Sequence, residues 1–134
     1  MEHKTIALSG VKVHYVEAGQ GPVVLLLHGL GSSLDTWRRN VEPLADAGFT
    51  VLAPDLPGHG DSEKPDALDY GPRTAVDFTG QFLSALGVER LRWWVTQPGD
   101  LWPPCSLLRI QRKPADWRWS LPEESAARFP GCYV

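Results

Sequence analysis

A tight turn of small residues follows the most apolar stretch of the chain and is the first candidate for chemistry. The run VVLLLH (residues 23–28) leads into GLGSS (29–33), which places glycines at positions 29 and 31. Backbone N–H groups at such a turn can bind an anionic group or stabilise negative charge that develops on a carbonyl oxygen. Two chemistries therefore compete here: binding of a dinucleotide phosphate and stabilisation of an oxyanion.

The dinucleotide hypothesis rests on the pattern G-x-G-x-x-G, in which glycines let the backbone approach a pyrophosphate at the start of a helix. Asp55, at the end of the next predicted strand, would then bind a ribose hydroxyl. Leu34 stands where the third glycine belongs, and the pattern does not require His28. A nucleotide-binding βαβ domain is therefore the weaker alternative.

The oxyanion hypothesis gains a second motif further along the chain. The segment VLAPDLPGHGDSEKP (51–65) contains D-x-x-G-x-G-x-S, which begins at Asp55. Together with the His-Gly turn, it resembles the α/β-hydrolase superfamily over about residues 10–90. The resemblance implies an oxyanion hole in which Leu30 offers its N–H to the oxyanion and Gly29 lets the turn form.

The resemblance implies structural roles for the other residues of the two motifs. The catalytic histidine of this family comes late in the chain, so His28 and His59 are predicted to be structural. Asp55 is predicted to anchor its turn by hydrogen bonds. Ser32 and Ser33 have no base at a suggestive spacing and are predicted to start a helix. The structural motif residues are His28, Gly31, Asp55, Gly58, His59, Gly60 and Ser62.

The surrounding sequence predicts the strands that hold these turns. Segments 4–9 and 11–18 form a hairpin, because Gly10 lies between them and the second segment has a period of two. Apolar strands at 23–28 and 49–56 flank a helical segment, which predicts a parallel βαβ unit. The predicted fold class is α/β: the N-terminal part of an α/β-hydrolase fold, with an antiparallel hairpin leading into parallel strands flanked by helices and an incomplete sheet.

Two helical segments complete the predicted fold. In residues 34–48, Pro43 predicts a break or a fresh helix start, and Gly48 suits the position after the helix. Pro72 opens a second helix, which ends at Gly87. The buried face of the second helix is predicted to consist of Ala75, Thr79, Phe82, Leu83 and Leu86.

The composition of the chain changes at about residue 90. All four histidines, 12 of the 16 acidic residues and one tryptophan lie before this point, whereas both cysteines and five tryptophans lie after it. Residues 1–90 hold 7 basic side chains, and residues 91–134 hold 6 basic and 4 acidic ones. We therefore predict a partial α/β-hydrolase domain over 1–90 and an atypical tail over 91–134, with no regular period from Trp93 onward.

The resemblance implies a nucleophile elbow, G-x-S-x-G, shortly after residue 90, with an acid and a histidine much later. No G-x-S-x-G occurs in the 134 residues, and no catalytic residue is assigned. Tryptophan has a single codon, so Trp93 and Trp94 fix the bases TGGTGG. The shifted frame begins at the third base of the Arg92 codon. From there to the second base of the Asp100 codon, the chain can encode Val-Val-Gly-His-Ser-Ala-Gly-Gly, an intact elbow. The tail is therefore predicted to be out of frame after loss of one base following the Arg90 codon.

In the shifted reading frame, the codon at the nucleophile position can encode Ser, Thr, Pro or Ala, but not Asp. Relatives that open epoxides or cleave carbon–halogen bonds use Asp there, and often Pro at the position of Gly31. The resemblance therefore implies a serine hydrolase as the parent: an esterase, a lipase or a carbon–carbon bond hydrolase with a small-molecule, ester-like substrate. The chain as written is predicted to be an inactive truncated product. The alternatives are an enzyme that is active only when the frame is restored or a second fragment complements it, and a small binding module with a genuine divergent tail.

Composition and spacing also exclude several classes of partner. The net charge of −3 predicts no nucleic-acid partner. The apolar run PVVLLLHGL is too short to cross a membrane, and the absence of a signal-peptide pattern predicts a cytoplasmic protein. Cys105 and Cys132 lack metal-ligand spacing, so no metal and no cofactor are predicted. Nothing in the sequence indicates an oligomeric state.

Overall fold

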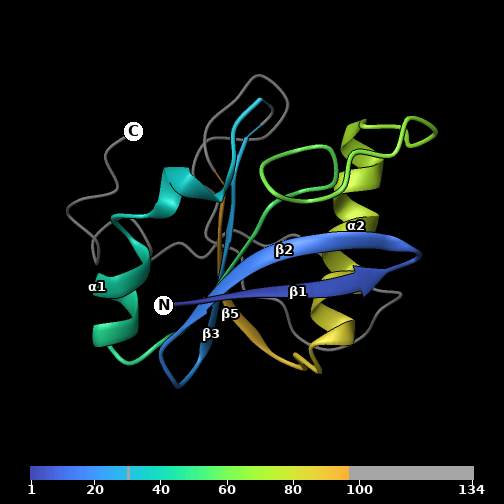
Figure 1. The fold of residues 1–134 in the computed structure, drawn as a ribbon. Coiled ribbons are helices and arrows are strands. Elements are labelled where there is room, and N and C mark those ends of the chain that lie inside the picture. Colours follow the sequence, from blue (N-terminus) through green and yellow to red (C-terminus); the bar gives the residue numbers. More distant parts are fainter. Residues whose placement is uncertain (30, 97–134) are drawn as a thin grey trace.

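The computed structural model of the chain describes residues 1–29 and 31–96. These residues form a five-stranded mixed sheet with the strand order β1-β2-β4-β3-β5, flanked by helices (Figure 1). In chain order the elements are β1 (Glu2–Leu8), β2 (Val11–Ala18), β3 (Val23–Leu27), the 3-10 helix η1 (Leu34–Trp37), α1 (Val41–Asp46), β4 (Thr50–Pro54), α2 (Pro72–Ala85) and β5 (Leu91–Thr96).

The predicted N-terminal hairpin is confirmed. β1 and β2 pair antiparallel, and the last pair is Leu8 with Val11. The two residues between the strands, Ser9 and Gly10, have φ angles of 47° and 83°. Positive φ at both positions is typical of the tight turns that match the twist of a two-stranded ribbon. β2 then pairs antiparallel with β4, which connects the hairpin to the rest of the sheet.

The predicted parallel strands are also confirmed. β3 pairs parallel with β4 on one side and with β5 on the other. The β3–β5 register runs from Val23 opposite Leu91 to Leu27 opposite Thr96. Because the strands run in the same direction, the chain leaves β3 and β5 at the same edge of the sheet.

The sequence has no regular period from Trp93 onward, yet the first part of the predicted tail forms a strand. The structure places Leu91–Thr96 in β5, with each residue from Trp93 to Thr96 opposite a residue of β3. A strand is held by backbone hydrogen bonds to its neighbour, so it forms here without a side-chain period of two. Trp, Val and Thr also favour extended backbone. Residues 97–134 of the predicted tail lie outside the described residues.

Two apolar cores cover the two faces of the sheet, as the alternation of side chains along a strand requires. Leu25 and Leu27 of β3 belong to the core that includes Phe78 and Phe82 of α2. Val24 and Leu26 belong to the other core, which includes Trp37 of η1 and Val41 of α1. The apolar run of β3 is thus buried from both sides, which agrees with helices on both faces in Figure 1.

The segment 34–48 contains two short helices instead of one long helix. α1 begins at Val41, so Pro43 lies in its first turn, where the missing N–H of proline is tolerated. Ser33 caps η1, because its Oγ accepts the N–H of Asp35 at 3.4 Å. On α2, Thr79, Phe82 and Leu83 are buried as predicted, and Ala75 and Leu86 are partly buried against the core. Phe78 is buried as well, which the prediction missed.

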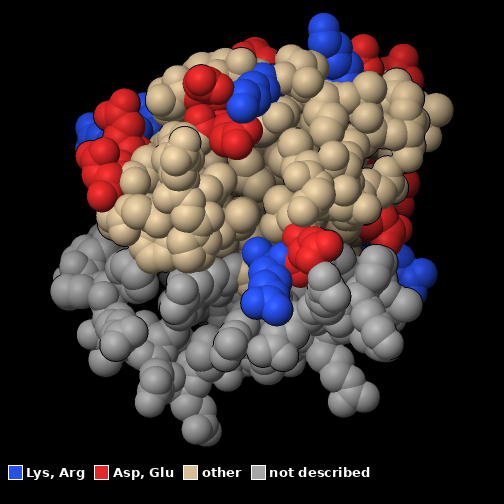
Figure 2. Space-filling view, turned by 90° about the horizontal axis from the view of Figure 1, so that it is seen from below, with Lys and Arg blue, Asp and Glu red and all other residues tan. Residues whose placement is uncertain are grey.

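The charged side chains of the described surface are mixed in sign. On the face drawn in Figure 2, Lys and Arg side chains lie beside Asp and Glu, with uncharged residues between them. Within residues 1–29 and 31–96, no helix combines the length and the apolar character that crossing a bilayer requires.

Candidate functional site

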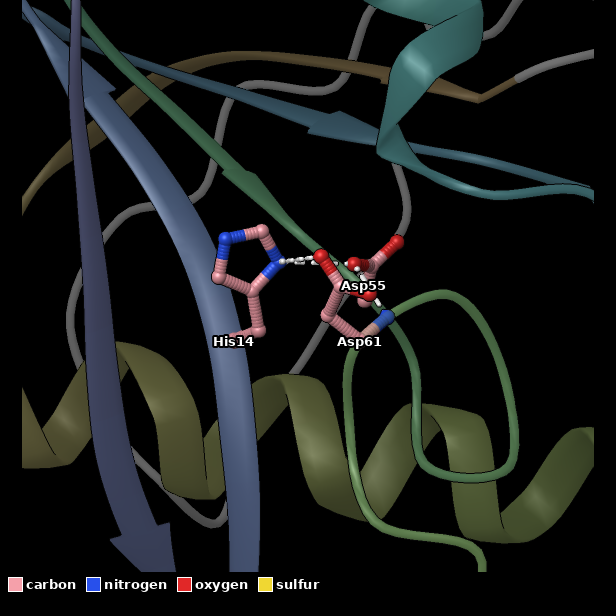
Figure 3. Close-up of side chains that lie close together, drawn as sticks. All are labelled: His14, Asp55 and Asp61. Atoms are coloured by element: carbon pink, nitrogen blue, oxygen red, sulfur yellow. Dashed lines mark hydrogen bonds and ion pairs between the residues drawn. The ribbon is translucent and has the colours of Figure 1, made fainter.

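The Asp55 carboxylate lies at the centre of the predicted motif loop. Its side chain is 2% exposed, and Oδ1 accepts the N–H of Leu34 at 2.8 Å. Oδ2 accepts the N–H of Asp61 at 3.1 Å and lies 2.8 Å from Nδ1 of His14 (Figure 3). One carboxylate thus joins β2, the start of η1 and its own loop. Because both oxygens are bound within the protein, Asp55 is not available to a ribose hydroxyl.

Gly60 lets the loop pass close to this carboxylate. Its φ is 49°, and a Cβ at this position would overlap the carboxyl group of Asp55. Any other side chain would therefore push the loop away from its anchor. Gly58 also has a positive φ of 84° and lies against the ring of Tyr70.

Ser62 is the last residue of the motif, and its hydroxyl both donates and accepts a hydrogen bond. Its Oγ donates to the carbonyl oxygen of Asp55 at 2.7 Å and accepts the N–H of His14 at 2.9 Å. The side chain is buried, with 3% exposed. A hydroxyl engaged in this way connects the loop to β2 and has no neighbouring base to activate it as a nucleophile.

His28 is buried at the end of β3 with both ring nitrogens bound. Nδ1 donates to the carbonyl oxygen of Gly29 at 2.9 Å, and Nε2 accepts the N–H of Leu56 at 2.9 Å. Burial lowers the pKa of His28 below its ordinary value of 6.5. Nε2 lies 4.0 Å from Oδ1 of Asp55, but it carries no proton for an ion pair. The ring therefore ties the turn after β3 to the loop after β4.

His59 lies next to His28, with ring centroids 5.1 Å apart. Its Nδ1 lies 3.1 Å from the carbonyl oxygen of Pro57, to which it can donate a hydrogen bond within the loop. The ring is half-buried. These contacts are those of a residue that packs the loop, in line with the structural role predicted for His59.

The predicted oxyanion turn follows β3 directly. Gly29 is buried, and its carbonyl oxygen accepts the N–H of Ser32 at 3.2 Å. Gly31 has a φ of 71°, and no atom of the described residues lies within 4 Å of a Cβ built on it. Leu30 lies outside the described residues, so its N–H remains a predicted oxyanion donor. Because Leu27 is opposite Thr96, the turn begins beside the end of β5.

Sequence reasoning missed the contribution of His14. This residue brings the only imidazole that contacts the Asp55 carboxylate within 3 Å in the described part of the chain. The contact depends on the antiparallel pairing of β2 with β4, in which Tyr15 lies opposite Pro54. The sequence shows that His14, between the buried Val13 and Tyr15, lies on the opposite face of the strand. It does not show that His14 contacts Asp55.

Comparison with known proteins agrees with this geometry. A family described as "alpha/beta hydrolase fold" matches residues 22–95, more than half of the chain, and the chain therefore belongs to the α/β-hydrolase family. Epoxide hydrolase 3 of Siraitia grosvenorii is 39% identical over 95 residues, which cover 68% of this chain and 29% of that protein.

Two solved structures illustrate the range of the relatives. The epoxide hydrolase of Vigna radiata is 36% identical with a TM-score of 0.66, over 71% of this chain and 31% of that one. A membrane phospholipase A, a bacterial virulence factor, is 34% identical with a TM-score of 0.68, over 71% of this chain and 31% of that one. The chain thus spans less than a third of the length of these relatives.

Proposed function

We propose that the chain is the N-terminal portion of a hydrolase that acts on a small-molecule substrate. The nucleophile elbow of this hydrolase belongs directly after β5. The observation that carries this proposal is the parallel register of β3 and β5, in which Leu27 lies opposite Thr96. A nucleophile that follows β5 would lie beside the turn that begins at Gly29. Acyl transfer needs this juxtaposition, because the oxyanion forms on the carbonyl oxygen of the carbon that the nucleophile attacks.

The codons that can encode this stretch agree with this position. With one base restored after the Arg90 codon, the hidden serine becomes residue 97, the position immediately after β5. The family match ends at residue 95, five residues after the proposed loss of a base. Together these observations support an out-of-frame tail.

The chain as written is proposed to have no hydrolytic activity. In the described part of the chain, no serine hydroxyl is hydrogen-bonded to a histidine ring, the contact that activates a serine nucleophile. Ser62 and His28 bind backbone groups instead. What this chain supplies is the scaffold of two loops and the oxyanion turn.

A second candidate function follows from the names of the relatives. The Siraitia and Vigna proteins are named as epoxide hydrolases, whereas the hidden codon favours a serine and hence an ester-like substrate. The two candidates differ in the nucleophile, because family members that open epoxides use Asp at the elbow. The phospholipase A relative is equally close in fold, so fold similarity alone does not choose between them.

The experiment that tests the proposal restores the reading frame. One base is inserted into the gene between the codons for Arg90 and Trp93, and the product is assayed with a p-nitrophenyl ester and with styrene oxide. We expect ester hydrolysis that is lost when the elbow serine is replaced by alanine. Turnover of the epoxide alone would favour the second candidate. Stop codons within the first few codons of the restored frame would contradict the frame argument and leave the tail as authentic sequence.

A further inference from the structure

We propose that His3 and His14 form a two-histidine binding site for a divalent transition-metal ion such as Zn²⁺. The site lies on the first two strands of the sheet, apart from the oxyanion turn, and does not depend on the proposed hydrolase function. Imidazole nitrogens are common ligands of Zn²⁺, Cu²⁺ and Ni²⁺.

The spacing of the two rings is close to that of metal ligands. Nδ1 of His3 lies 3.0 Å from Nε2 of His14, a hydrogen bond whose proton an ion would replace. The ring planes are 14° from parallel with centroids 5.2 Å apart, so the two nitrogens face each other edge to edge. Two nitrogens bound to one tetrahedral Zn²⁺ at about 2.0–2.1 Å lie roughly 3.3 Å apart. His3 is exposed on the edge strand β1, so its ring can make this small adjustment.

The hydrogen bonds around Asp55 orient His14 as a ligand. The Asp55 oxygens already accept N–H groups from Leu34 and Asp61, so the carboxylate acts as an acceptor and the Nδ1 of His14 is the donor. In the neutral imidazole, Nε2 then presents its lone pair toward His3. A carboxylate that fixes the tautomer of a ligating histidine is a recurrent feature of zinc sites.

The opposite side of His14 is a poorer site, although His14, Asp55 and Asp61 offer ligand atoms within 4.8 Å of one another. An ion there would displace the Nδ1 proton from Asp55 and compete for Oδ2, which also accepts the N–H of Asp61. The Asp61 carboxylate is 86% exposed and lies 3.9 Å from Nδ1. Figure 3 shows the second ring nitrogen of His14 on the side away from both aspartates.

A bound ion would link the edge strand β1 to β2 through their side chains. Lys4, the neighbour of His3 on β1, is bound to Glu17 at 2.7 Å. Side chains alternate along a strand, so this pair lies on the opposite face and does not oppose the ion. Water would complete the coordination on the exposed side of His3.

The test is a calorimetric titration of the untagged full-length chain with Zn²⁺. We expect one saturable site in the wild-type chain, and the same affinity in D61N and in H59Q. The H3Q variant removes one ligand and leaves the contact of His14 with Asp55 in place, so we expect its affinity to fall at least about tenfold. Binding should also shift the ring ¹⁵N resonances of His3 Nδ1 and His14 Nε2.

Three results would overturn the proposal. The first is the absence of saturable binding by the wild-type chain, and the second is equal affinity in H3Q and wild type. The third is loss of binding in D61N with H3Q unchanged, which would assign the ion to the aspartate side of His14. Circular dichroism of each variant separates loss of the site from loss of the fold, since His3 and Asp61 are exposed.

Discussion

The loop after β4 and the turn after β3 lie close together but are built in different ways. In the loop, the space that a Cβ on Gly60 would need is filled by the Asp55 carboxyl group, and the Ser62 hydroxyl is bound on both sides. In the turn, a Cβ on Gly31 would meet no atom of residues 1–29 or 31–96 within 4 Å. The polar groups of the loop are therefore engaged in contacts within the protein, whereas among the described residues a side chain at Gly31 would meet no neighbour.

The largest effect is expected from Asp55→Ala. The substitution leaves the buried N–H of Leu34 and the N–H of Asp61 without an acceptor, and it removes the partner of His14. We expect a loss of about 3–5 kcal/mol in the free energy of unfolding, measured by urea denaturation. Because stabilities of whole domains are only about 5–15 kcal/mol, the variant would be close to unfolded.

The matched control for this substitution is Asp61→Asn, which changes an exposed carboxylate in the same loop. We expect its unfolding free energy to lie within about 0.5 kcal/mol of the wild-type value. Equal effects of the two substitutions would show that the loop is not anchored through Asp55.

A pair of glycine substitutions tests the contrast between the filled loop and the open turn. Gly60 and Gly31 both have positive φ, so alanine at either position costs about 1–2 kcal/mol of backbone strain. Alanine at Gly60 also collides with the Asp55 carboxyl group, which adds about 1–3 kcal/mol. Denaturation midpoints that fall by the same amount in both variants would contradict the difference in packing.

A smaller, pH-dependent effect is expected from His28. Burial lowers its pKa in the folded chain, so the unfolded chain binds a proton first as the pH falls. The stability contribution of the neutral ring is complete above about pH 6.5 and declines as the pH falls from there toward the folded-state pKa. We expect the unfolding free energy of wild type to decrease more steeply than that of His28→Asn over this range. If the unfolding free energies of the two proteins change equally with pH, His28 does not have a lowered pKa in the folded chain.

The sequence predicted the parts of the fold that depend on local pattern. The apolar run of β3 and the helical spacing of α2 are local signals, and both elements formed as expected. β5 was missed because its residues have no period of two, while its hydrogen bonds to β3 are long-range. Phe78 was left out of the buried face, although it stacks on Phe82 with centroids 6.1 Å apart.

The site was predictable to a similar extent. The motif residues were located by their spacing, and the contacts of Asp55, His28 and Ser62 agree with structural roles that the sequence could only predict. His14 could not be found in this way, because its contact with Asp55 depends on residues 41 positions apart. Pairing between distant strands has no signal in a single sequence.

We propose that this chain supplies a hydrolase scaffold without the nucleophile elbow of its family. The most direct test is the rate at which the purified chain hydrolyses a short-chain p-nitrophenyl ester and styrene oxide, each compared with buffer. We predict no rate above buffer for either compound. Turnover well above buffer that is abolished by Ser32→Ala or Ser33→Ala would contradict the account, because it would place a working nucleophile in the turn that we assign to oxyanion binding.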